Sequence, residues 1–101
     1  MATNKLVRDK IPEIIEKSGK KPVVRIMEED EYIKALEIKL DEEVAEYHES
    51  GEIEELADVL EVIYALCEAQ GYSVEQLMTV YQNKHNERGG FKKKIFLIDK
   101  E

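Results

Sequence analysis

Glycines recur along this chain, and each glycine or glycine pair follows a stretch with the composition of a helix. A helix that ends in a left-handed residue favours glycine there, and the positions are Gly19, Gly51, Gly71 and the Gly89-Gly90 pair. The sequence therefore predicts four helices, at residues 11–18, 29–50, 52–70 and 73–88. Pro12 suits the first turn of a helix, and Ser73 with Gln76 has the pattern of a capping box.

The rest of the chain leaves room for little besides these helices. Residues 22–27 and 94–98 are rich in branched or aromatic side chains, and we expect them to be extended and to pair as a small sheet. The 101 residues fit one domain, residues 1–101, and 43% of them are hydrophobic, enough for a modest core. The expected fold class is an all-α domain with minor extended segments.

Composition excludes several classes of protein. No apolar run is long enough to span a bilayer, and the first residues lack the apolar stretch of a secretory signal, so we expect a cytoplasmic protein. Cys67 is the single cysteine, which excludes an internal disulfide and a multi-cysteine metal site. The net charge of −8 has the wrong sign for a surface that binds nucleic acid or an anionic membrane.

Two pairs of acidic residues interrupt apolar helix faces. Glu43 falls within the apolar stripe of the second expected helix, and Glu46 lies at its border. On the third helix Glu55 continues an apolar stripe, with Asp58 one turn further on. A carboxylate on a buried face needs a proton, a partner charge or a metal ion.

The two pairs lie at matching distances from a turn. Glu46 precedes Gly51 by 5 residues and Glu55 follows it by 4, while Glu43 and Asp58 are 8 and 7 residues away. In an antiparallel hairpin the pairs come level, and their mutual repulsion would be relieved by a divalent cation. Oxygen ligands favour Mg²⁺, with Mn²⁺ as a substitute, over zinc. We predict that all four acids are metal ligands.

The fourth expected helix carries groups that suit a phosphate. Asn83, Lys84 and Arg88 lie near its C-terminal end, with the two cations aligned on one face. Basic residues at a helix C-terminus also complement the helix dipole and often do nothing else. The sequence does not place Arg8 and Lys10 relative to these groups.

These residues together resemble a known superfamily. Glu42-Glu43-Val44-Ala45-Glu46 followed by Glu55-Leu56-Ala57-Asp58 is similar to the EExxE…ExxD signature of the all-α nucleoside triphosphate pyrophosphohydrolases, which include the MazG-like and phosphoribosyl-ATP enzymes. The segment from Asn83 to Arg88 resembles that superfamily's NxKxxxR element. The opening segment, residues 4–12, and Arg88-Gly89-Gly90-Phe91 resemble a small single-domain MazG-like subgroup. Only 8 residues separate Glu46 from Glu55, fewer than the usual pattern has, which leaves less wall around a nucleotide base.

The resemblance implies a magnesium-dependent reaction. A nucleoside triphosphate or related nucleotide would be hydrolysed between its α and β phosphates, giving a monophosphate and pyrophosphate. Glu43, Glu46, Glu55 and Asp58 would bind the metal, and Glu42 would orient the attacking water. Asn83, Lys84 and Arg88 would bind the phosphates.

Two alternatives and the oligomeric state stay open at this stage. The substrate of such an enzyme could be phosphoribosyl-ATP of histidine biosynthesis. The chain could instead be a non-catalytic helical module for dimerisation or protein interaction. A short chain buries little surface alone, and the third helix is apolar on most of its circumference. We therefore expect a homodimer that completes a four-helix bundle, or a dimer of dimers.

Overall fold

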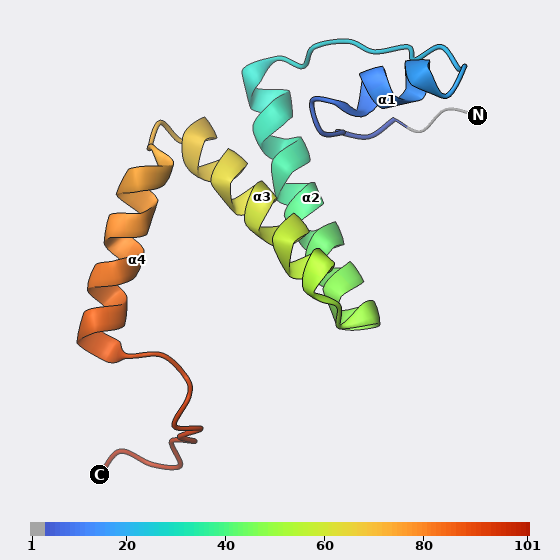
Figure 1. Ribbon diagram of the computed structural model, residues 1–101. Coiled ribbons are helices and arrows are strands. Elements are labelled where there is room, and N and C mark those ends of the chain that lie inside the picture. Colours follow the sequence, from blue (N-terminus) through green and yellow to red (C-terminus); the bar gives the residue numbers. More distant parts are fainter. Residues whose placement is uncertain (1–3) are drawn as a thin grey trace.

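The protein is a four-helix chain without a β-strand in residues 4–101, which are the residues that the computed structural model describes (Figure 1). The fold is all-α, as predicted, and every predicted helix is confirmed to within one residue at either end. The helices, with their observed bounds, are α1 (Ile11–Lys17), α2 (Glu29–Ser50), α3 (Ile53–Ala69) and α4 (Val74–Arg88).

The helix ends confirm the signals in the sequence. Gly51 ends α2 in the left-handed conformation, with φ of +67°, and its N–H donates to the carbonyl of Tyr47 at 2.7 Å. The α4 start is a complete capping box, because the Ser73 hydroxyl accepts from the Gln76 N–H at 3.1 Å and Gln76 Oε1 accepts from the Ser73 N–H at 2.8 Å. Local chemistry therefore sets where α2 ends and where α4 begins.

The α2 and α3 helices pack side by side as an antiparallel hairpin (Figure 1). Its small core contains Leu36 of α2 with Val62 and Cys67 of α3. The α4 helix contacts α3 and not α2. In Figure 1 it leads away from the hairpin that carries the two pairs of acids.

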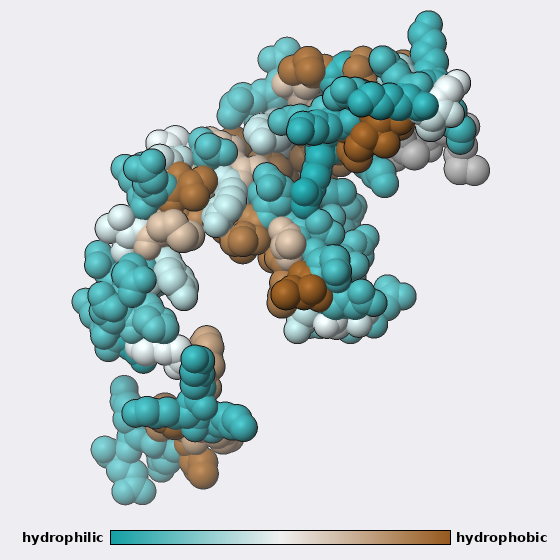
Figure 2. Space-filling model, in the orientation of Figure 1, coloured by the Kyte–Doolittle hydropathy of each residue, from teal (hydrophilic) through white to brown (hydrophobic). Residues whose placement is uncertain are grey.

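One side of α3 is left uncovered. Two apolar stripes run along this helix, and Val62, on the stripe that also contains Val59 and Leu66, is buried. The other stripe is exposed to solvent over most of its length, at Ile53, Leu56, Leu60 and Ile63. Figure 2 shows apolar surface along the hairpin and again in the chain after α4. A single copy therefore covers only one of the two faces that the sequence predicts to be buried.

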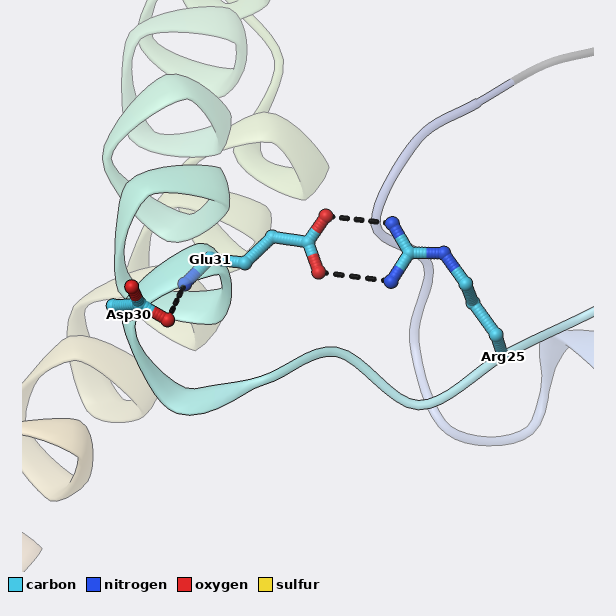
Figure 3. A network of polar contacts seen from close by, with 3 residues as sticks. All are labelled: Arg25, Asp30 and Glu31. Atoms are coloured by element: carbon cyan, nitrogen blue, oxygen red, sulfur yellow. Dashed lines mark hydrogen bonds and ion pairs between the residues drawn. The ribbon is translucent and has the colours of Figure 1, made fainter.

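An ion pair holds the segment before α2 against the first turn of that helix. Arg25 donates to both carboxylate oxygens of Glu31, at 2.8 and 2.6 Å, and Asp30 Oδ1 accepts from the Glu31 N–H (Figure 3). The hydrogen bond from Arg25 is the main cause of a lowered pKa at Glu31. The contact fixes the direction in which residues 22–27 approach α2.

The predicted pairing of residues 22–27 with 94–98 does not occur within residues 4–101 of one copy. The two segments lie at opposite ends of the molecule, separated by the helices (Figure 1). The prediction of an intrachain sheet was wrong because α4 leads away from the hairpin and takes the C-terminal segment with it. None of the helices in the described chain is long and apolar enough to cross a membrane.

We expect Gly51→Ala to lower the free energy of unfolding by about 1–2 kcal/mol, the cost of left-handed backbone for an L-residue. An added Cβ meets nothing within 4 Å, so the effect is conformational and not steric. Urea denaturation measures it. Gly90→Ala is the matched control, because Gly90 does not have positive φ, and it should change stability by less than about 0.5 kcal/mol. Equal effects of the two substitutions would contradict the role given to Gly51.

Candidate metal centre

The turn at Gly51 brings three carboxylates from two helices together. Glu43 of α2 and Glu55 and Asp58 of α3 each place one carboxylate oxygen so that all three lie within 4.8 Å of one another. The proximity of these acids follows from the hairpin geometry, because residues at similar distances from the turn lie side by side in antiparallel helices. Three of the four predicted ligands are therefore neighbours in the folded chain.

Two of these carboxylates have buried oxygens without partners. Glu43 is only 8% exposed, and its Oε2 atom has no hydrogen-bond partner. Glu55 Oε2 is also buried without a partner. An unsatisfied buried acceptor costs about 1–3 kcal/mol. Both atoms are therefore poised to accept a bond from a proton or a cation.

Lys39 is the nearest cation on α2, and it only partly compensates these charges. Its Nζ lies 3.6 Å from Glu43 Oε1 and 3.8 Å from Glu42 Oε2. The ammonium group thus interacts with one oxygen of Glu43 and leaves the other, Oε2, unbonded.

The environment favours the protonated form of two of the acids. Burial raises the pKa of the Glu43 carboxyl most, the charge of Glu46 raises it further, and Lys39 acts in the opposite direction. Burial also raises the pKa of Glu55, followed by the charges of Glu46 and Asp58. Like charges at close range in a partly dry site are the physical cause.

The donor set fits a hard divalent cation. All three groups supply carboxylate oxygens, which Mg²⁺ and Mn²⁺ prefer. A dication among them would bond the unpartnered oxygens and would offset both the burial and the repulsion that raise the two pKa values. The two buried, unpartnered oxygens are the observation that separates this cluster from an ordinary acidic helix surface.

Glu46 and Glu42 lie at the edge of the cluster. Glu46 is exposed and is not part of the three-residue group, although its charge raises the pKa of both Glu43 and Glu55. Glu42 is exposed and lies near Lys39. Ligation by Glu46 and orientation of water by Glu42 therefore stay predictions.

The predicted phosphate-binding groups are not brought to the cluster within one copy. Asn83, Lys84 and Arg88 are exposed on α4, which does not contact α2. Among the described residues, no hydrogen bond or ion pair joins them to Glu43, Glu55 or Asp58. Their role stays a prediction that one copy of the chain does not fulfil.

Arg8 reaches the cluster from the N-terminal segment. Its Nη2 donates to Asp58 Oδ1 at 2.7 Å, across a separation of 50 residues. Both side chains are partly exposed, so the pair stabilises the fold by no more than about 1 kcal/mol. Spacing along the chain could not reveal this contact, because it depends on how the N-terminal segment folds over the hairpin.

A hollow beside the cluster is too small for a nucleotide. It has a volume of about 130 Å³ and lies between the N-terminal segment and α2, with Lys39 and Glu42 in its wall. Sites for small molecules usually have volumes of roughly 300–1,000 Å³. A nucleotide that used the acids would therefore need further walls.

Comparisons with known proteins name no activity for this chain. No family model matches it, and no solved structure matches it significantly. A protein of Mycolicibacterium smegmatis that is described as uncharacterized is 63% identical to it over 41 residues. The match covers 41% of this chain and 42% of that protein, so the chain spans about two fifths of the relative's length.

We expect Glu43→Gln to raise the free energy of unfolding of the metal-free protein at neutral pH. It keeps the shape of the side chain and removes one of the repelling charges, an effect on the order of 1 kcal/mol. Glu49→Gln, an exposed position on the same helix, is the control and should change stability by less than about 0.5 kcal/mol. A lower free energy of unfolding in Glu43→Gln would contradict this prediction, because it would show that the negative charge of Glu43 is compensated by its surroundings.

The same cluster predicts a pH dependence. Because the folded-state pKa of Glu43 and Glu55 is raised above 4.5, the folded protein binds protons more tightly than the unfolded chain just above that pH. This contribution to stability is present below pH 4.5 and is lost as pH rises through the raised values. Denaturation at a series of pH values should show a weaker loss in Glu43→Gln than in the natural chain. Parallel curves for the two proteins would contradict this assignment.

Proposed function

We propose that the chain is a magnesium-dependent nucleotide pyrophosphohydrolase that cleaves a nucleoside triphosphate, or a related nucleotide, between its α and β phosphates. The products are a nucleoside monophosphate and pyrophosphate. The observation that carries the proposal is the three-carboxylate cluster with two buried oxygens that lack partners. The resemblance of the acidic motifs to the all-α pyrophosphohydrolases supplies the reaction.

Each group in the cluster has a proposed role. Glu43, Glu55 and Asp58 would hold the metal, with Glu46 as a further ligand at the open edge. A bound Mg²⁺ supplies neutralisation of phosphate charge and a water of lowered pKa. Glu42 would accept a proton from the attacking water, and the Nζ of Lys39 lies 3.8 Å from Oε2 of that carboxylate.

Cations around the cluster would bind the triphosphate. Arg8 already has its guanidinium at Asp58, and a guanidinium can bond two phosphate oxygens at once. Lys84 and Arg88 of α4, with Asn83, would hold the departing pyrophosphate. The net charge of −8 gives the surrounding surface the wrong sign for a phosphate, so these few cations must supply the attraction.

A panel of nucleotides, assayed for pyrophosphate with and without magnesium, tests the activity directly. It also separates general nucleoside triphosphates from phosphoribosyl-ATP. Calorimetric titration with magnesium, with and without a non-hydrolysable triphosphate, separates an enzyme from a non-catalytic interaction module. Only an enzyme requires metal and nucleotide to strengthen each other's binding.

We expect Asp58→Asn to lower magnesium-dependent pyrophosphate release by at least about 100-fold, because an amide is a weaker ligand than a carboxylate. Asp41→Asn is the matched control, since Asp41 is exposed on α2 and outside the cluster, and it should keep full activity. Circular dichroism checks that both variants are helical. Full activity in Asp58→Asn would exclude Asp58 as a metal ligand.

We expect Arg8→Gln to raise the KM for the nucleotide by about tenfold, the usual consequence of losing a charge-assisted phosphate contact worth about 1.4 kcal/mol. Stability should change by less than about 1 kcal/mol, because the pair with Asp58 is exposed. Lys17→Gln is the control, since Lys17 pairs with Glu13 inside α1. An unchanged KM in Arg8→Gln would remove Arg8 from the substrate site.

A further inference from the structure

One copy of the chain is too open to be a complete folded unit. Its radius of gyration is 18.0 Å, against about 13 Å for a compact domain of this length. Its accessible surface of 9477 Å² is about 3,600 Å² more than a compact monomer of 11.7 kDa exposes. A standard interface buries about 800 Å² on each partner, so the excess is ample for a stable association with a second copy.

Two extended apolar segments account for part of this excess. Val23 and Ile26 precede α2 and are 94% and 93% exposed, while Phe96 and Ile98 follow α4 and are 87% and 90% exposed. Within the described chain, no backbone hydrogen bond outside the helices involves residues 22–27 or 95–98. Both segments therefore offer free N–H and C=O groups beside apolar side chains, which is the condition for strand pairing.

We infer that residues 23–26 of one copy pair as an antiparallel strand with residues 95–98 of a second copy. The two segments of one chain lie at opposite ends of the molecule, whose longest dimension is 61 Å (Figure 1). The C-terminal segment of a chain cannot reach residues 23–26 of the same chain, but the C-terminal segment of a second copy can. Reciprocal exchange gives two identical two-stranded sheets related by a two-fold axis.

Charge selects the antiparallel direction. In this direction Lys92, Lys93 and Lys94 lie beside Glu28 and Glu29 of the other copy. The parallel direction would instead bring the same lysines to the end of the strand where Lys20 and Lys21 lie. Opposite charges near the shared end of the two strands stabilise the pair, and like charges destabilise it.

The backbone at the ends of the segments sets the register. Lys94 has φ of +58°, which is not extended, so the C-terminal strand begins at Ile95. Pro22 has no N–H to donate, which suits the position just before a strand. Pairing Ile26 with Ile95 then sets Val24 opposite Leu97. Arg25, whose guanidinium is held by Glu31 (Figure 3), lies opposite Phe96, where an aromatic ring can stack on it.

The exchange also brings the end of α4 toward the helix that carries Glu43 in the other copy, which bears on the function proposed above. In an antiparallel pair, the chain before Ile95 and the partner's chain after Ile26 leave the sheet at the same end. The basic end of α4 therefore approaches the start of the partner's α2. Glu43 is 14 residues into that helix, about 21 Å from its start. A turn in which the Lys94 N–H donates to the Phe91 carbonyl shortens the 6 residues that follow Arg88, so the exchange by itself does not bring Lys84 and Arg88 to the acids of the second copy.

Disulfide trapping between separate chains tests the pairing without reference to activity. Chains with Val24→Cys are mixed with tagged chains that have Leu97→Cys, and the mixture is oxidised and run without reductant. We expect a covalent heterodimer. The matched control replaces Leu97→Cys with Phe96→Cys, which lies on the other face of the strand, and we expect about tenfold less product. The native Cys67 is buried, with its Sγ donating to the carbonyl of Ser73, and is present in every chain.

Other results of this experiment would overturn the inference. They are equal trapping by the two pairs, no heterodimer, or a crosslink formed only inside a chain that carries both Val24→Cys and Leu97→Cys. As a second measurement, light scattering should show a dimer for the natural chain, and Ile95→Asp with Leu97→Asp should raise its dissociation constant by about tenfold or more. A monomeric natural chain, or unchanged dissociation with helical content intact, would also overturn it. Failure of the nucleotide assay would leave the trapping result standing.

Discussion

Repulsion among carboxylates that the fold forces together is the interaction on which the rest of this structure depends. Burial and neighbouring charges raise the pKa of Glu43 and Glu55, and each has an oxygen without a partner. The hairpin accepts this cost although apolar residues at the same positions would pack more favourably. In the function proposed above, this group of acids serves to bind a dication, which the donor atoms allow.

The second constraint is the small core. Leu36, Val62 and Cys67 are the buried apolar residues of the described chain, and one face of α3 is open. The site shares this incompleteness, because its hollow is smaller than a nucleotide and its predicted phosphate-binding cations lie on a helix that leads away from it. A second copy would supply the missing apolar cover and would bring the end of α4 toward the helix that carries Glu43.

Local rules explain why the helices could be predicted so closely. Gly51 and the Ser73-Gln76 capping box act through bonds within a few residues, and a local interaction is visible in sequence. The acids could be predicted as neighbours for a related reason. In an antiparallel hairpin with a short turn, residues at equal distances from the turn lie at the same level. Glu46 shows the limit of this reasoning, because its charge acts on Glu43 and Glu55 while its own side chain is exposed and lies outside the three-residue group.

The sequence by itself determined the four helices, their ends and the meeting of acids across a tight hairpin, because short-range hydrogen bonds and helical periodicity decide these features. Only the tertiary structure decided that Arg8 bonds Asp58, that α4 leaves the hairpin and that residues 22–27 and 94–98 lie apart. These features depend on the relative orientation of elements joined by loops. That orientation depends on which apolar faces become buried against one another. Burial of this kind is a property of the whole folded protein and cannot be predicted from a local sequence pattern.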